Sequence, residues 1–72
     1  PMKKVYIFID DISRSGGTER VATFLSNQMF LSGFSVTLIS LALEGGNTYY
    51  PLQPGVKLEV LSESTLYELF LF

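Results

Sequence analysis

Apolar runs separated by turn residues predict the order strand, helix, strand, strand along this chain. Residues 5–9 are continuously apolar and rich in β-branched and aromatic side chains, which is typical of a strand buried on both faces at the centre of a parallel sheet. Residues 36–41 predict a second strand of this kind. Residues 56–60 alternate apolar positions with Lys57 and Glu59, so we expect a strand with one solvated face or at a sheet edge.

Residues 21–31 have the spacing of an amphipathic helix. One side of this helix carries the mainly apolar set Val21, Ala22, Leu25 and Met29, with Phe24 beside them and the polar Gln28 among them. The other side carries mostly Thr23, Ser26 and Asn27. We expect Phe24, Leu25 and Met29 to pack on the sheet as core. Thr18 is the expected N-cap, and Gly33 the expected left-handed stop.

The remaining segments are predicted loops and a tail. Residues 10–17 and 44–55 contain the turn residues, and the pair Gly45-Gly46 precedes no helix, so we expect a flexible turn without a phosphate role. Residues 62–65 would cap a short helix. Leu66–Phe72 is apolar nearly all round, and we expect it to pack on the open sheet face, against another chain or against a further part of this one.

Together these elements predict an α/β fold, a partial Rossmann-like unit in which a three-stranded, mostly parallel sheet carries one main helix. Residues 1–72 would form a single, incomplete domain. A right-handed crossover covers one sheet face and leaves the other short of cover. Because 47% of the residues are hydrophobic and the mean hydropathy is +0.33, we expect part of a larger fold or a homo-oligomer, formed through that open face or the Leu66–Phe72 tail.

Composition excludes several function classes. The net charge is −2 and five basic residues are scattered along the chain, which argues against nucleic-acid binding. Cysteine and histidine are absent, so neither a disulfide, a thiolate metal site nor an imidazole base is available. No apolar run approaches the roughly 20 residues that span a bilayer. Asp10 and Asp11 end the first apolar run too early for a signal peptide, and we expect a cytoplasmic protein.

The residues Ser15-Gly16-Gly17-Thr18-Glu19-Arg20 carry the candidate chemistry. They lie between a predicted strand and a predicted helix, where unbonded backbone N–H groups and the helix dipole favour an anion. Adjacent glycines would let a phosphate approach the backbone. Alternatively, the turn needs small residues only for close strand–helix packing. The motif matches neither the Walker A loop nor the dinucleotide G-x-G-x-x-G spacing.

Two aspartates follow the first strand, at the sheet end where open α/β folds bind ligands. Asp10 and Asp11 would suit an acid–base dyad or a metal site. Loop aspartates more often are solvated or accept hydrogen bonds from nearby backbone N–H groups, and we favour that interpretation. Ser13 and Arg14 lie on the same rim and could contact an anionic acceptor.

From about residue 2 to residue 61 the chain resembles the start of a GT-B fold glycosyltransferase of family 4, the group 1 type. The resemblance rests on an ordered set of segments: residues 3–8 (KKVYIF), 16–21 (GGTERV), 31–40 (LSGFSVTLIS) and 55–61 (GVKLEVL). Such enzymes transfer a sugar from a nucleotide-sugar donor to a glycan or lipid acceptor with retention. Their N-terminal Rossmann-like domain mainly holds the acceptor, and their C-terminal domain holds the donor.

The resemblance implies that the backbone N–H groups of Gly16 and Gly17 contact the donor diphosphate, with Thr18 adding a hydroxyl. Ser13, Arg14 and Glu19 would line the acceptor rim, and the open alternative for Glu19 is a solvated pair with Arg20 on the first helical turn. Neither a metal nor another cofactor is implied. The paired glutamates and the basic phosphate clamp of the family lie outside these residues. We therefore expect that this chain contains no catalytic residue and does not transfer a sugar by itself. We expect the protein to be cytoplasmic or peripheral to the inner membrane face. The alternative is a stand-alone α/β binding or assembly module without catalysis.

Overall fold

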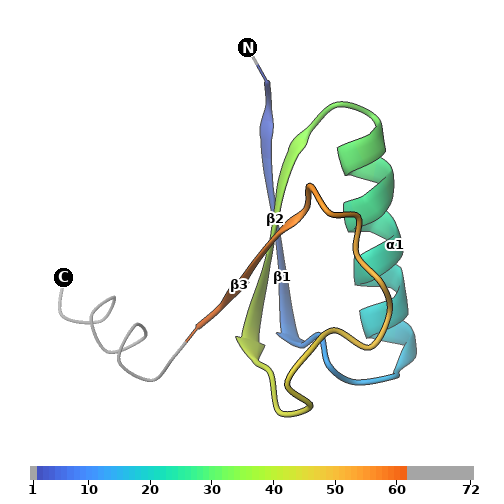
Figure 1. Ribbon diagram of the computed structural model, residues 1–72, viewed down its shortest axis with the longest axis vertical. Coiled ribbons are helices and arrows are strands. Elements are labelled where there is room, and N and C mark those ends of the chain that lie inside the picture. Colours follow the sequence, from blue (N-terminus) through green and yellow to red (C-terminus); the bar gives the residue numbers. More distant parts are fainter. Residues whose placement is uncertain (1, 62–72) are drawn as a thin grey trace, which may run out of the picture.

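The computed structural model describes residues 2–61, in which a parallel sheet carries one helix (Figure 1). The strand order is β1-β2-β3, and both strand pairs are parallel. This arrangement confirms the predicted α/β, partial Rossmann-like class. The elements in chain order are β1 (Lys4–Asp11), α1 (Gly17–Leu31), β2 (Ser35–Ala42) and β3 (Lys57–Val60).

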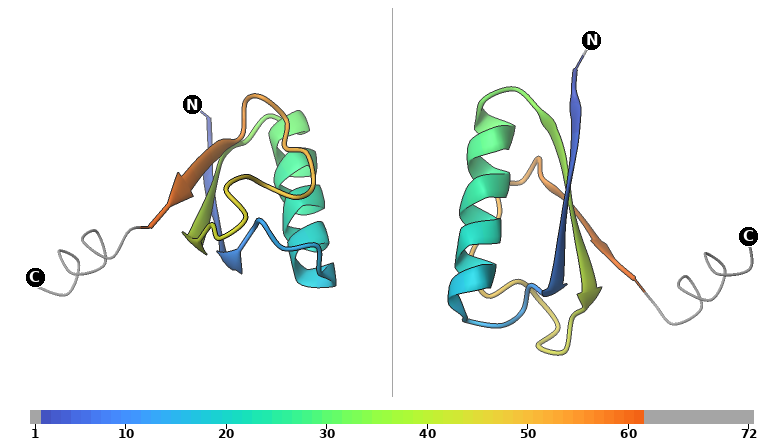
Figure 2. Two further views of the ribbon diagram at one scale, coloured as in Figure 1. Left: turned by 60° about the horizontal axis from the view of Figure 1, so that its bottom comes forward. Right: turned by 180° about the vertical axis from the view of Figure 1, so that it is seen from behind.

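The core lies between the sheet and α1. In β2, alternate side chains point towards α1, and Val36 and Leu38 are buried there together with Ile9 of β1. The segment 43–56 runs over the same side and adds Val56 to this cluster (Figure 2). On the opposite face Tyr6 and Phe8 remain 56% and 67% exposed. The expected one-sided cover is thus confirmed for the described residues.

The position of β1 differs from the prediction. Its apolar sequence predicts a strand buried on both faces at the sheet centre, yet β2 occupies the centre and β1 an edge. Within residues 2–61 no strand lies on the outer side of β1, and that missing neighbour is the physical reason for the difference. The prediction for β3 is confirmed, since this edge strand exposes Lys57 and Glu59.

The buried side of α1 also differs from the prediction. Ala22, Thr23 and Ser26 are buried, whereas Val21, Phe24 and Leu25 are 65%, 64% and 45% exposed. The hydroxyl of Thr23 donates to the Glu19 carbonyl and that of Ser26 to the Ala22 carbonyl, each at 2.8 Å. Because these bonds satisfy the hydroxyls within the helix, small polar residues can take the crowded side. Met29 does pack against the core, as expected.

A glycine lies at each end of α1. The N-cap is Gly16 rather than the expected Thr18, and it makes no side-chain cap hydrogen bond. At the other end Gly33 has φ +97°, which confirms the left-handed stop. The Phe34 N–H bonds to the Met29 carbonyl and the Gly33 N–H to the Phe30 carbonyl, a Schellman motif.

Two further predictions concern the end of the first strand and the C-terminal tail. Asp10 and Asp11 belong to β1 rather than to the following loop, because the pairing with β2 continues as far as Asp11 and Ala42. The predicted short helix and the Leu66–Phe72 tail lie outside the described residues. Between residues 2 and 61, no helix has the length and apolar character needed to cross a bilayer.

Candidate functional site at the carboxyl end of the sheet

The carboxyl ends of β1 and β2 meet the beginning of α1 at one end of the molecule (Figure 1). Two loops join there: residues 12–16 lead into α1, and residues 43–50 follow β2. They are tied together directly, since the Tyr49 N–H bonds to the Ile12 carbonyl at 3.2 Å and the Tyr50 hydroxyl donates to the Ser15 carbonyl at 2.6 Å. The second bond positions the turn that precedes Gly16.

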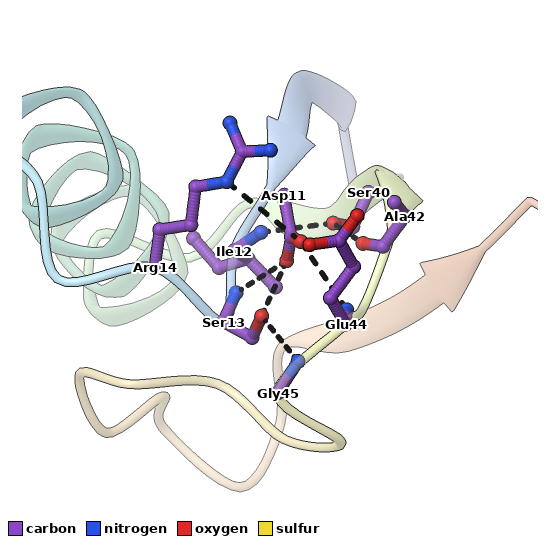
Figure 3. Close-up of polar contacts among 8 residues, drawn as sticks. All are labelled: Asp11, Ile12, Ser13, Arg14, Ser40, Ala42, Glu44 and Gly45. Atoms are coloured by element: carbon purple, nitrogen blue, oxygen red, sulfur yellow. Dashed lines mark hydrogen bonds and ion pairs between the residues drawn. The ribbon is translucent and has the colours of Figure 1, made fainter.

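Asp11 is the centre of the polar contacts in this region (Figure 3). Its side chain is fully buried. Oδ1 accepts hydrogen bonds from the Ser13 N–H at 2.9 Å and from the Ser13 hydroxyl at 2.5 Å, and Oδ2 accepts one from the Glu44 N–H at 3.2 Å. The expectation that an aspartate here binds backbone N–H groups is confirmed for Asp11.

Asp10 takes no part in this network. Consecutive residues of a strand point to opposite faces, so Asp10 lies exposed on the face that lacks α1. The two carboxylates are therefore not brought together as a dyad. In the described part of the chain, no group of three or more acidic, histidine or cysteine side chains is arranged to hold a metal ion.

The loop after β2 fits closely against the loop after β1. The Gly45 N–H donates to the Ser13 hydroxyl at 2.9 Å, and a Cβ at Gly45 would lie 2.9 Å from the Ser13 Cβ. Gly46 has φ +82°, a conformation that favours glycine. The turn predicted at Gly45-Gly46 is present, and each of the two glycines also meets a specific geometric requirement in it.

Ser40 is a residue of this region that the sequence motifs did not indicate. Its fully buried hydroxyl accepts from the Ile12 N–H at 3.0 Å and donates to the Ala42 carbonyl at 2.5 Å. It thereby joins the beginning of the 12–16 loop to the end of β2. The sequence signal that could have identified Ser40 is a serine inside an otherwise apolar strand. Its hydroxyl would be buried there and would need hydrogen-bond partners.

The pKa of the Asp11 carboxyl is lowered. The hydrogen bond from the Ser13 hydroxyl contributes most, the Ser13 and Glu44 N–H groups and the Arg14 charge act in the same direction, and burial opposes them. Arg14 Nε lies 3.9 Å from Asp11 Oδ2, and its side chain is 57% exposed. A carboxylate held in its charged form by these donors is a structural anchor for both loops rather than a proton acceptor.

The lowered pKa of Asp11 predicts a pH dependence of stability. Since the unfolded chain binds this proton more readily, the contribution is present above the ordinary value of 3.8 and is lost as the pH falls through the folded pKa. We expect the free energy of unfolding to decrease from about pH 5 downwards, and less steeply in Asp11→Asn. Urea unfolding at several pH values measures the slope. The exposed neighbour variant Asp10→Asn is the control, and an unchanged slope in Asp11→Asn would contradict the assignment.

The first turn of α1 presents unbonded donors. The Arg20 N–H bonds to the Gly16 carbonyl and closes the first helical turn. In the described residues no acceptor reaches the N–H groups of Gly17, Thr18 or Glu19. Gly16, Gly17 and Thr18 are all exposed. Three donors at the positive end of the helix dipole form a local environment suited to an anion.

The two glycines of this turn differ in what the fold requires of them. A Cβ at Gly16 would overlap the carboxyl end of the Glu19 side chain, which folds back over it and would have to shift. A Cβ at Gly17 would have nothing within 4 Å. The φ of Gly17 is not positive, since only Gly33 and Gly46 have positive φ among the described glycines. Neither packing nor conformation requires a glycine at position 17.

The three residues expected on the acceptor rim lie in different environments. Ser13 is committed to Asp11 and Gly45, and Glu19 is only 7% exposed beside Gly16. Arg14 projects into solvent beyond its contact with Asp11. Of these three, Arg14 has the side chain most available to a ligand.

Comparison with known proteins gives one informative similarity. No protein-family model matches the chain, and no solved structure matches it. The chain is 43% identical over 72 residues to a protein of Erwinia amylovora described as "Amylovoran biosynthesis glycosyltransferase AmsD". The match spans 99% of this chain but 20% of the relative's length. It confirms the resemblance to a glycosyltransferase: over nearly its whole length, this chain is similar to one fifth of such an enzyme.

Proposed function

We propose that this sequence forms the N-terminal, acceptor-side part of a retaining glycosyltransferase with the GT-B fold. The complete enzyme would transfer a sugar from a nucleotide-sugar donor to a glycan or lipid acceptor, at a cytoplasmic site peripheral to the membrane. Support comes from the 43% identity to a glycosyltransferase and from the parallel sheet whose carboxyl edge meets a glycine-led helix.

The observation that carries the proposal is Gly17. No neighbouring atom restricts position 17, and the missing side chain of Gly17 leaves open space beside free N–H groups. A ligand that approaches the backbone closely would account for it. The donor diphosphate has the required charge and acceptor oxygens.

In this proposal the chain supplies binding groups and no catalytic residue. The N–H groups of Gly17 and Thr18 and the Thr18 hydroxyl would donate to the diphosphate, while exposed Arg14 would meet an anionic acceptor. Neutralising a leaving diphosphate favours bond cleavage at the sugar. The groups that hold the sugar are expected outside these residues, so we expect the 72-residue chain by itself to transfer none.

A chimera tests the proposal. The matched segment of the Erwinia amylovora glycosyltransferase would be replaced by this chain, and the sugar-transfer rate measured with and without substitutions at Gly17. We expect an active chimera. Gly17→Asp should lower the rate about 100-fold, since hydrogen bonds to a charged group are lost and a like charge is added. Gly17→Ala should lower it about tenfold through its methyl group alone.

The matched control is Gln28→Glu, which adds one negative charge at an exposed position nearer the other end of α1. It should leave the rate within about twofold, as expected for a surface change away from the ligand. Thermal unfolding of each chimera separates lost binding from lost folding. A rate in Gly17→Asp equal to that of the control would refute the phosphate role.

A further inference from the structure

Tyr50 connects the loop after β2 to the glycine turn that precedes α1. Its hydroxyl donates to the Ser15 carbonyl at 2.6 Å, across 35 positions of sequence. This carbonyl belongs to the same peptide group as the Gly16 N–H. Since no peptide bond of the described residues is cis, the N–H points opposite to the carbonyl. A hydroxyl that holds the Ser15 carbonyl therefore also sets the direction of the first N–H group of the glycine turn.

The backbone on both sides of Tyr50 is held in place. Before it, the Tyr49 N–H bonds to the Ile12 carbonyl at 3.2 Å. After it, the side chain of Asn27 on α1 donates to the Pro51 carbonyl at 3.0 Å and accepts from the backbone N–H two residues further on at 2.8 Å. The proline also restricts the residue before it to extended conformations. The Tyr50 hydroxyl is thus presented by a segment that is attached both to the 12–16 loop and to α1 (Figure 1).

Other contacts hold the two loops together without Tyr50. The buried side chains of Asp11 and Ser40 bond across them, to the Glu44 N–H and from the Ile12 N–H respectively. The hydrogen bond of Tyr50 is exposed by comparison, and water competes for both of its groups, so it contributes little to overall stability. Its main effect is local, on the peptide group that leads into Gly16.

We propose that Tyr50 is a positioning residue for donor binding, whose hydroxyl keeps the N–H groups of the glycine turn oriented for the donor diphosphate. This inference rests on the proposed function and deepens it. Without the hydroxyl, the peptide group between Ser15 and Gly16 can rotate, and each binding event would have to fix it again. Donation to the carbonyl also polarises the peptide group, which makes the Gly16 N–H a stronger donor. Tyr50 thus acts on the ligand through the backbone.

Tyr50→Phe in the glycosyltransferase chimera tests the proposal, because it removes the hydroxyl and keeps the ring. Inorganic diphosphate is the probe, used as an inhibitor that competes with the nucleotide-sugar donor. We expect its inhibition constant and the KM for the donor to rise about fivefold, the effect of one lost hydrogen bond. The KM for the acceptor should stay within about twofold. Tyr49→Phe is the matched control, since it removes the same hydroxyl from the adjacent ring, which is 62% exposed, and it should leave all three constants unchanged.

A variant of Asn27 tests whether the attachment to α1 acts through Tyr50. Asn27 lies ten residues beyond Gly17 along the helix, which is roughly 15 Å and too far for contact with a ligand at the first turn. Asn27→Ala releases the Pro51 carbonyl, and it should raise the inhibition constant of diphosphate about threefold. In the Tyr50→Phe background it should have no further effect. Equal effects in both backgrounds would overturn this route.

The outcomes separate this inference from the proposed function. Unchanged constants in Tyr50→Phe, in an enzyme that Gly17→Asp does impair, would overturn the role of Tyr50 and leave the phosphate role standing. A lower kcat with both KM values and the inhibition constant unchanged would also overturn it, because that pattern indicates less folded enzyme rather than lost positioning. Full activity of Gly17→Asp would remove the phosphate role and this inference with it. Thermal unfolding verifies that each chimera is folded.

Discussion

Replacing Leu38 with alanine is expected to lower the free energy of unfolding by about 3 kcal/mol, as is typical for a buried leucine in a core that cannot collapse around the cavity. Leu38 lies at the middle of the central strand, is fully buried and belongs to the cluster between the sheet and α1. Strands flank it on both sides, because it pairs with Ile7 and with Leu58. Backbone pairing on both sides leaves little freedom to close the cavity. Urea unfolding followed by circular dichroism measures the loss.

Leu41→Ala is the matched control for this experiment. The same leucine side chain in the same strand is 43% exposed on the opposite face, so its truncation should cost less than about 1 kcal/mol. Equal losses at the two positions would contradict the assignment of the core to the α1 side. In a unit of 72 residues, a loss of about 3 kcal/mol is a large part of the whole stability, and a largely unfolded Leu38→Ala chain would agree with the prediction.

Local patterns predicted the elements of the fold and where α1 ends. Apolar runs marked β1 and β2, charged alternation marked β3, and Gly33 marked the helix end, because each signal is contained within a few neighbouring residues. Helix orientation was predicted less well. A hydrophobicity pattern treats Thr23 and Ser26 as polar residues and therefore places them on the solvent side of the helix. In the structure their hydroxyls donate to carbonyls of the same helix, which allows both side chains to be buried.

The place of β1 in the sheet illustrates a different limit. Its uninterrupted apolar sequence indicates a strand with neighbours on both sides, and the described residues supply only β2. The apolar pattern therefore indicates two strand neighbours for β1, whereas residues 2–61 contain one of them, β2.

The candidate site was predictable where its contacts are short in sequence. The glycine turn and the backbone contacts of Asp11 with Ser13 follow from neighbouring residues. The side-chain hydrogen bonds that join this region span 28 to 35 positions, such as Ser40 with Ile12 and Tyr50 with Ser15. Such pairs depend on how β1 and β2 align, which single-sequence patterns do not encode.

Replacing Gly55 with alanine is expected to lower the free energy of unfolding by about 2 kcal/mol, because the added methyl group overpacks its surroundings. Gly55 lies in the turn before β3, and a Cβ there would overlap the ring of Phe30 from α1. Phe30 is partly buried and packs against the core, so moving the ring away from Gly55 would disturb these apolar contacts. Either the ring leaves the core or the turn moves, and a moving turn would expose Val56, now 8% exposed.

Two variants separate this overlap from a general effect of losing a glycine. Gly17→Ala adds the same methyl group where nothing lies within 4 Å, and it should leave the stability unchanged or raise it by about 0.5 kcal/mol. Pairing Gly55→Ala with Phe30→Leu removes the ring that the methyl group meets, so the double variant should lose less than the sum of the two single losses. Strict additivity, or a Gly55→Ala loss no larger than that of Gly17→Ala, would show that Phe30 does not require the glycine. A double-variant loss smaller than the sum of the two single losses instead identifies the contact between Phe30 of α1 and this turn as one that holds the start of β3 in place.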